Sequence, residues 1–379
     1  MNILGIFINK SIFLVLPNQK NEKKYQNQIK RAHYNEILLL MKKLLRLPIR
    51  YWLIYFVSII SICIINVFLF VFIKSENRNA FCPRCSNQKE IIYNEVEEIT
   101  FITVPRPFLK KNAYKRNKLA ISSWLSSSNR SRVILFVNRS EFDPSGEFPN
   151  EIEKRYGAER IQYLGPIRSN HNGVPYIDDW FRKGIDFSQS KYVCFINGDI
   201  LLSSKWLDRV KHVFSAMNEK PVVMIGQRID FTLTDDEYDR IDFSSHHLLS
   251  DIDEMVNRSK HSDHSPYGVD TFTFRVDKPP FDVEMIPPFI MGRYNWDNWL
   301  VGWLNTIADT VTFNTNPPIY HVDHQRNNFD VSDNLVAINH HLKKANKDYF
   351  GSNYDTKFEI SRNRLIRRGI GTFTTLPNL

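Results

Sequence analysis

The sequence predicts an α/β fold in which a sheet of mainly parallel strands is flanked by helices on both faces. The first observation behind this prediction is the alternation of short apolar runs with longer helical patterns along residues 98–225. Strand and helix signals that alternate every ~25 to 35 residues are typical of βαβ units and a parallel sheet. The second observation is the run Tyr-Val-Cys-Phe-Ile at residues 192–196. Five consecutive strand-type residues indicate a strand buried on both faces, as in a sheet covered by helices.

The individual elements follow from local signals. The first strand is expected at residues 98–104, because Pro105 and Pro107 cannot continue a strand's hydrogen bonding. Further strands are expected at residues 132–137, 161–164, 192–196, 222–225, 268–274 and from 319. Helices are expected at residues 112–125, 149–156, 176–187, 204–217 and 246–257, and from 296. Ser204 and Asn295 are expected to cap two of these helices, since Ser and Asn are favoured N-cap residues.

Residues 51–73 are expected to form a transmembrane helix. The run is uncharged and is interrupted only by Ser58, Ser61 and Asn66. At about 1.5 Å per residue it would extend roughly 35 Å, enough to cross a hydrocarbon core of about 30 Å. Basic residues gather before the run, so the positive-inside rule places residues 1–50 in the cytosol and the remainder in the lumen. A cleaved signal peptide is disfavoured because the run starts far from the amino terminus; whether Met1 or Met41 is the true start stays open.

The rest of the chain divides by composition. Residues 74–97 are polar without a clear period and are expected as a lumenal stem, followed by the folded domain at 98–345 and a carboxy-terminal extension at 346–379. Cys82 and Cys85 in the stem are expected as a disulfide or free thiols, because one C-x-x-C lacks the second ligand pair of a zinc site. Acceptor triplets for N-glycosylation begin at Asn129, Asn138 and Asn257.

Composition and motifs exclude several classes of ligand. The net charge is +9, but no basic block interleaved with aromatics occurs outside the membrane flank, so nucleic acid is not an expected partner. The sequence contains neither G-x-G-x-x-G nor G-x-x-x-x-G-K-[ST], which argues against a dinucleotide site and a P-loop. If phosphates bind, a metal ion is the natural group to hold them.

The strongest candidate for a metal ligand is Asp199. Gly198 permits a tight turn after the strand at 192–196, so Asp199 is expected at that strand's carboxyl end, where open α/β sheets bind ligands. A carboxylate at this position can bind Mg²⁺ or Mn²⁺. The alternative is that Asn197-Gly198-Asp199 is only a turn without a binding role, since all three are turn-forming residues. His321 and His324 follow the last strand, and either could complete the metal shell. A further cluster of histidines lacks paired spacing and is expected on a solvated surface rather than at a metal: His246, His247, His261 and His264.

A second candidate is Asp297, in the first turn of the helix near residue 296. The free amides of that turn stabilise a carboxylate, so a capping role is the simple explanation. Trp296 and Trp299 flank it, and aromatic faces beside a carboxylate suit a sugar ring whose hydroxyl needs a base. Arg293 would either balance phosphates or pair with a nearby acid.

These segments together resemble a family of GT-A-fold nucleotide-diphospho-sugar transferases, which are type II membrane proteins of the secretory pathway. The resemblance covers roughly residues 98–330 and is most specific at 292–300. It is carried by the single anchor and by the segments Phe-Ile-Asn-Gly-Asp-Ile (195–200), Gly-Val-Asp (268–270), Pro-Pro-Phe (287–289), Gly-Arg-Tyr-Asn-Trp-Asp-Asn-Trp-Leu (292–300) and His-Gln (324–325). It implies a GT-A-like, Rossmann-type mixed sheet and a D-x-D-like element that binds the metal and the diphosphate. Asn197 departs from that element, because it replaces the first acid.

The resemblance implies transfer of a sugar from a nucleotide-diphospho-sugar to a hydroxyl of a lumenal glycan or glycoprotein, in the Golgi or endoplasmic reticulum. In this interpretation Asp199 and His324 hold Mn²⁺ or Mg²⁺, and Asp297 is the base if the reaction inverts the stereochemistry of the sugar. The nucleotide and its phosphates would contact residues at the strand ends: Thr103, Pro105, Arg106, Asn197, Asp199 and Arg293. The alternative is a catalytically silent carbohydrate-binding or scaffolding protein, which Asn197 favours. A nucleotidyltransferase that makes activated sugars would also fit the predicted sheet. The membrane anchor and the absence of a Gly-rich phosphate loop argue against it.

Overall fold

The structure is a computed structural model, and it describes residues 83–105, 111–143, 146, 148–218, 220–243, 245–314, 318–324, 334–361, 364–369 and 373–375. The expected membrane segment at 51–73 and Arg106 lie outside these residues, as do Met1, Met41 and the side chains of Cys82 and Cys85. Within the described ranges, no helix combines the length and the apolar character needed to cross a bilayer.

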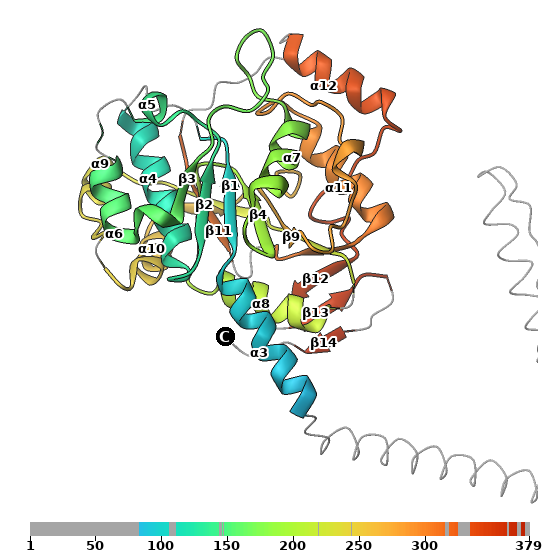
Figure 1. The fold of residues 1–379 in the computed structure, drawn as a ribbon, viewed down its shortest axis with the longest axis horizontal. Helices are drawn as coiled ribbons and strands as arrows, with labels where there is room; N and C mark the ends of the chain where they lie inside the picture. Colours follow the sequence, from blue (N-terminus) through green and yellow to red (C-terminus); the bar gives the residue numbers. More distant parts are fainter. Residues whose placement is uncertain are drawn as a thin grey trace, which may run out of the picture. The chain divides into compact units, whose positions relative to one another are not determined.

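The fold is a mixed α/β arrangement built on a ten-stranded sheet flanked by helices (Figure 1). The first four strands are parallel to their neighbours, in the order β3-β2-β1-β4: β1 (Thr100–Thr103), β2 (Arg132–Leu135), β3 (Ile161–Tyr163) and β4 (Tyr192–Ile196). The prediction of parallel βαβ units is confirmed for this half.

Beyond β4 the sheet becomes mixed. β9 (Thr271–Arg275) lies antiparallel between β4 and β6 (Val222–Ile225), and β10 (Asp309–Thr312) runs parallel to β6. The sequence predicted β9 as a strand but not its direction, because alternation of side chains is the same in both directions. The remaining strands are β12 (Phe358–Ser361), β13 (Arg364–Arg367) and β14 (Phe373–Thr375). The segment expected as a carboxy-terminal extension therefore completes the sheet.

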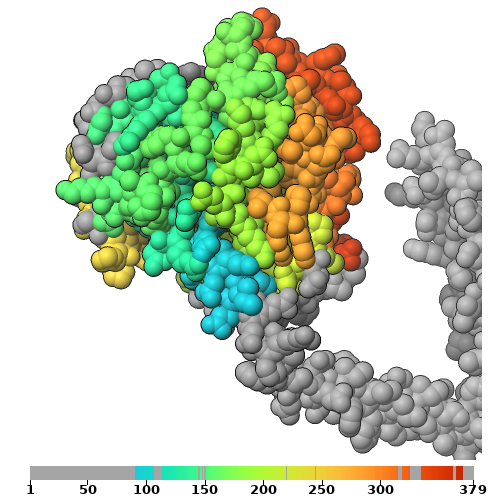
Figure 2. All heavy atoms as spheres, in the orientation of Figure 1, coloured from blue at the N-terminus to red at the C-terminus, as the bar shows by residue number. Residues whose placement is uncertain are grey.

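Helices cover both faces of this sheet because successive strand residues point to opposite sides. Phe101 and Cys194 pack with α3 (Pro83–Glu97), α4 (Lys111–Ser126) and α8 (Trp206–Ala216). Ile102 and Phe195 pack instead with α7 (Ile177–Phe187) and α11 (Trp296–Ile307). Figure 2 shows α7 in lime and α11 in orange, side by side on the viewer's face.

Shorter helical segments and one further helix complete the described chain. They are α5 (Arg139–Phe142), a π-helix (Pro149–Glu153), α6 (Lys154–Tyr156), two 3₁₀ turns (Ala158–Arg160 and Val283–Met285), α9 (Asp235–Asp239), α10 (Leu248–Arg258) and α12 (Asn334–Ala345). The prediction of helices near 149–156 and 246–257 is confirmed in outline.

A second sheet of four short strands adjoins the carboxyl end of β4. Its order is β5-β11-β7-β8, formed by β5 (Ile200–Leu202), β11 (Ile319–Val322), β7 (Arg228–Phe231) and β8 (His261–Asp263). β11 is antiparallel to β5, with His321 opposite Ile200, and parallel to β7, with His321 opposite Asp230. Strands this short carry almost no periodic signal, so only β11 was predicted as a separate strand.

Three local expectations differ from the structure. The stem prediction missed α3, whose Ile92 and Val96 are buried in the core at 5% and 0% exposure. Ser204 does not cap α8; its hydroxyl donates to Asp253 Oδ2 (2.6 Å), and Lys205 occupies the cap position. Asn295 is at the cap position of α11, but with a left-handed backbone (φ 84°) and no side-chain capping bond.

Candidate metal site

The predicted site residues that follow β1 and β4 lie together. β1 and β4 are parallel neighbours, while the chain order continues from β1 to β2 on the other side, so their carboxyl ends form a switch point of the sheet. A Cβ added to Gly198 would lie 3.4 Å from the Cα of Pro105 and 3.6 Å from the hydroxyl of Thr103. Thr103 and Pro105 therefore border the Asn197–Asp199 loop, at the distance of an ordinary van der Waals contact.

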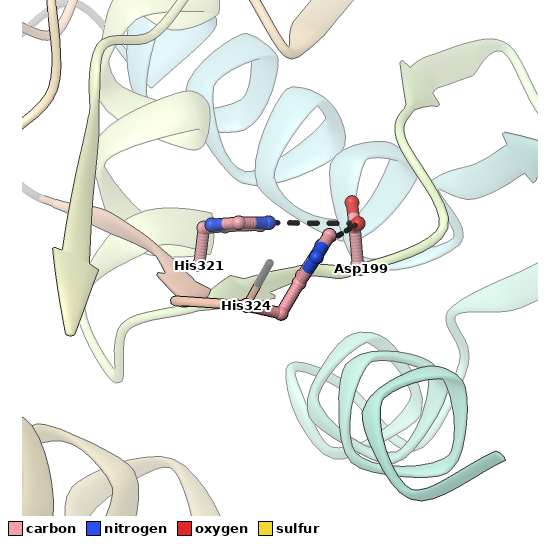
Figure 3. A group of neighbouring side chains, drawn as sticks. All are labelled: Asp199, His321 and His324. Carbon is pink, nitrogen blue, oxygen red and sulfur yellow. Dashed lines mark ion pairs between the residues drawn. The ribbon is translucent and has the colours of Figure 1, made fainter. Parts of the chain in front are cut away.

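Asp199, His321 and His324 bring three potential metal ligands to one point (Figure 3). Asp199 Oδ2 lies 3.5 Å from His321 Nε2 and 3.6 Å from His324 Nε2, and the ligand atoms all lie within 4.8 Å of one another. The small sheet explains the convergence, since β5 begins just after Asp199 and pairs with β11, which carries His321. The sequence left open which histidine is the ligand; the structure places both beside Asp199.

The chemistry of this donor set fits a divalent transition metal. Mn²⁺ accepts both carboxylate oxygen and neutral imidazole nitrogen, whereas Mg²⁺ strongly prefers oxygen. The Asp199 side chain is 28% exposed, so solvent or a substrate oxygen can reach the same point. Burial raises the pKa of Asp199, but the contacts with His321 and His324 outweigh it and hold that pKa well below its usual range. Asp199 is thus a carboxylate at neutral pH.

A buried hydrogen-bond network orients His321. Its Nδ1 lies 2.9 Å from Asp230 Oδ1, which is the outer contact that metal-binding histidines usually make with their second ring nitrogen. The other oxygen of Asp230 lies 2.6 Å from Nδ1 of His264. The prediction of a solvated histidine surface holds for His246, His247 and His261, which are exposed, but is wrong for His264.

The network continues from Asp230 through Arg228 to the loop after β4. Arg228 Nε donates to Asp230 (2.9 Å), and Arg228 Nη1 lies 2.6 and 2.7 Å from the two oxygens of Asp270. Asn197 Nδ2 donates to Asp270 Oδ1 (2.8 Å). Burial lowers the pKa of Arg228, but the neighbouring carboxylates of Asp270 and Asp230 raise it by more. The net effect is a raised pKa, so the guanidinium stays charged. Sequence reasoning missed Arg228 and Asp230, although Arg-x-Asp on a strand places both side chains on one face.

Asp297 lies partly buried in the first turn of α11. Burial raises its pKa to about 7, with a further contribution from Asp270, while hydrogen bonds from backbone amides, including those of Asn298 and Val269, oppose the rise. A carboxyl group that titrates near neutral pH suits a general base. Arg293, on the preceding loop, donates to the carbonyl of Gly292 (3.3 Å).

The expectation that Trp296 and Trp299 offer their faces to a sugar is wrong. Both pack in the core, with exposures of 7% and 2%, and Trp299 Nε1 donates to the carbonyl of Asn346 (2.9 Å). Exposed rings do occur near the start of α11: Tyr267 and Phe350 are 52% and 53% exposed with centroids 5.8 Å apart, and Tyr294 on the preceding loop is 58% exposed. Tyr267 is tied to α11 by Asn298, the residue after Asp297, whose side-chain amide donates to the carbonyl of Tyr267 (2.9 Å).

A cavity adjoins the three-ligand cluster and shares His324 with it. Its volume is about 340 Å³, and it lies between α4, α9 and the end of β11. Its lining mixes cationic, apolar and aromatic groups: Lys115, Arg116, Leu119, Leu233, Thr234, Asp235, Tyr238, Val322, Asp323 and His324. Lys115 Nζ is held 2.9 Å from both Asp235 and Asp239, which fixes α9 against α4. Sequence reasoning did not find this cavity, because α9 is only five residues long.

Comparison with known proteins leaves the family open. No family model and no curated protein matches the sequence. Among the solved structures that match is 4-diphosphocytidyl-2C-methyl-D-erythritol synthase from Anaerococcus prevotii, which is 12% identical. That alignment covers 65% of this chain and 98% of the synthase, with a TM-score of 0.31.

Proposed function

We propose that the protein is a metal-assisted glycosyltransferase that moves a sugar from a nucleotide-diphospho-sugar to a hydroxyl of a glycan or glycoprotein. The observation that carries the proposal is the convergence of Asp199, His321 and His324 at the carboxyl end of β4. Asp297 lies close enough to Asp270 for the two carboxyls to interact, and Asp270 in turn binds Asn197 in the same loop. A metal-ligand cluster and a carboxyl group of raised pKa are the two elements that such a transfer requires.

Each group has a distinct role in this proposal. Asp199, His321 and His324 would hold Mn²⁺ or Mg²⁺, and a bound divalent cation neutralises the charge that develops on a diphosphate leaving group. Thr103 and Pro105 border the donor, and the cavity beside His324 offers cationic and aromatic groups to the rest of the nucleotide. Asp297 takes the proton from the acceptor hydroxyl. Tyr267 and Phe350 supply exposed ring faces for the acceptor sugar.

The location of the reaction is also part of the proposal. It rests on the apolar segment at 51–73 and on the basic residues before it, which favour a single-pass type II protein of the Golgi or endoplasmic reticulum with a lumenal catalytic domain. The acceptor triplets beginning at Asn129, Asn138 and Asn257 are compatible with a lumenal domain.

The test is release of nucleoside diphosphate from a panel of nucleotide-sugars by the purified full chain with Mn²⁺. We expect release with one class of donor and its loss in Asp199→Ala, while Asp297→Asn keeps nucleotide binding and loses transfer. A folded Asp199→Ala protein with unchanged turnover would remove the metal role. No release from any donor would favour the second candidate, a silent carbohydrate-binding or scaffolding protein, which the missing acid at Asn197 motivates.

A further inference from the structure

The side chain of Asn197 is directed at a carboxylate. β4 and β9 are antiparallel with Ile196 opposite Thr271, and the backbone amide of Asn197 continues this ladder by donating to the carbonyl of Asp270 (3.1 Å). Asn197 and Asp270 are therefore cross-strand neighbours, whose side chains meet on one face of the sheet. The amide nitrogen Nδ2 of Asn197 donates to Asp270 Oδ1 at 2.8 Å. One N–H of this side-chain amide is thus bonded to Asp270.

The charges around Asp270 would not be balanced if a further carboxylate were added. The Asp270 side chain is 5% exposed and is neutralised by Arg228, whose side chain is 10% exposed. Arg228 also serves Asp230, so one guanidinium already compensates two acids. An aspartate at position 197 would place a second carboxylate within hydrogen-bond distance of Asp270, and the two could keep this contact only by binding a proton between them. Like charges in such a site are strongly unfavourable.

The same chain of contacts ends at a cation ligand. Arg228 binds Asp230, Asp230 binds His321 Nδ1, and His321 Nε2 faces Asp199. If Asp270 moved, Arg228 and then Asp230 would have to shift with it, and the imidazole of His321 would lose its position. Outer contacts of this kind typically change metal affinity by about 10- to 100-fold when they are lost.

We propose that Asn197 is a positioning residue: its amide completes the buried chain Asn197–Asp270–Arg228–Asp230–His321, which fixes His321 in the cation site. Asn197 is then not a weakened version of the first acid of a D-x-D element. The inference rests on the proposed function only for the presence of a cation at Asp199, and cation binding can be measured without any transfer reaction.

The decisive variant is Asn197→Asp, which restores the acid that the D-x-D pattern lacks. If Asn197 is a weakened ligand, this variant binds Mn²⁺ more tightly. If Asn197 completes the buried chain, the variant binds Mn²⁺ more weakly, by up to the roughly tenfold loss that is typical when a ligand histidine loses its own outer contact. The measurement is Mn²⁺ affinity by calorimetry and by the paramagnetic resonance signal of free Mn²⁺, using the full chain purified in mild detergent and freed of metal. Asn172→Asp adds the same charge on an exposed loop and is expected to leave the affinity unchanged.

A second variant tests the inference even if Asn197→Asp fails to fold. Asn197→Asp with Asp270→Asn exchanges the two groups, so that an amide can again donate to a carboxylate at the same place. Because an asparagine at position 270 keeps only one oxygen for Arg228, we expect this double variant to recover part of the affinity lost in Asn197→Asp, and to fold if the single variant does not. Unchanged or tighter Mn²⁺ binding by folded Asn197→Asp, or a double variant no better than the single one, would overturn the inference. Mn²⁺ binding with the expected pattern but no transfer activity would leave it standing and remove the proposed function.

Discussion

The raised pKa of Asp297 makes a quantitative prediction that needs no substrate. In an unfolded chain this carboxyl titrates at about 3.9, whereas in the native protein its pKa is about 7. Between these values the native state binds a proton that the unfolded state does not, so native stability falls as pH rises. Each unit of pKa difference corresponds to about 1.4 kcal/mol, which gives at most about 4 kcal/mol between pH 4 and pH 8. Because Asp297 is partly exposed, we expect about 2 kcal/mol.

The perturbation is Asp297→Asn, which keeps the shape and removes the titration. Its pH-independent effects, such as altered bonds to the backbone amides of α11, cancel when the same variant is compared at two pH values. About two of the three pKa units of the shift fall between pH 5 and pH 8, so we expect the stability difference, variant minus wild type, to be about 1.3 kcal/mol more favourable to the variant at pH 8 than at pH 5. The assay is urea unfolding of the full chain at both pH values, followed by tryptophan fluorescence and circular dichroism.

A surface control makes the result specific to this carboxyl. Asp263→Asn removes one acid from an exposed position on β8, and so accounts for a general change in net charge. The reasoning is refuted if the difference between Asp297→Asn and wild type is the same at pH 5 and pH 8. It is also refuted if Asp263→Asn reproduces the effect. In the proposed reaction the same titration predicts a transfer rate that rises with pH up to about 7 and then levels off.

Three further predictions follow from other parts of the structure. Since the cluster at Asp199 offers two imidazole nitrogens and one carboxylate, Mn²⁺ and Co²⁺ are expected to bind more tightly than Mg²⁺ by calorimetry; equal or tighter binding of Mg²⁺ would contradict the assigned ligands. Tyr267→Ala is expected to raise the acceptor KM severalfold with little change in donor KM, whereas Phe187→Ala, an exposed ring at the end of α7, is expected to change neither. Gly302→Ala is expected to destabilise the fold by about 2 kcal/mol or more in urea unfolding, because its Cβ would lie 2.4 Å from the backbone nitrogen of Phe350; a change below about 0.5 kcal/mol would show that α11 shifts freely.

The elements predicted correctly from the sequence are those with strong local signals. The strand at 192–196 is apolar on both faces, and the helix at 112–125 begins soon after two prolines that end the preceding strand. Asp199 was identified from such signals alone, because a buried strand and a glycine turn fix where the next side chain lies. The pairing of β5 with β11 joins segments far apart in the sequence and leaves no local pattern. The sequence therefore suggested the two histidines as candidate partners of Asp199 but could not show that both lie beside it.

The misjudged tryptophans had a signal that was available. Trp296, Trp299, Leu300 and Trp303 follow the i, i+3, i+4, i+7 spacing of a buried helix stripe, and all four lie in the core. Asp297 falls outside this stripe and remains partly exposed. The exposed aromatic pair could not be predicted, because Tyr267 and Phe350 are far apart in the sequence and meet only through the packing of α11 against residues 350 and 351.

The loop after β4 belongs to two sheets at once, and this determines how the site can be altered. β4 leaves the large sheet at Ile196, and β5 enters the small sheet at Ile200. Asn197 is bonded to Asp270 at the edge of the large sheet, whereas Asp199 faces His321 in the small sheet. Arg228 begins a strand of the small sheet and reaches back to Asp270. Since Asp199 directly precedes β5 and His321 lies on β11, the geometry of the candidate cation site depends on how the two sheets are held together. Changes at Asp270 or Arg228 are therefore expected to alter this geometry without replacing any of the three potential ligands.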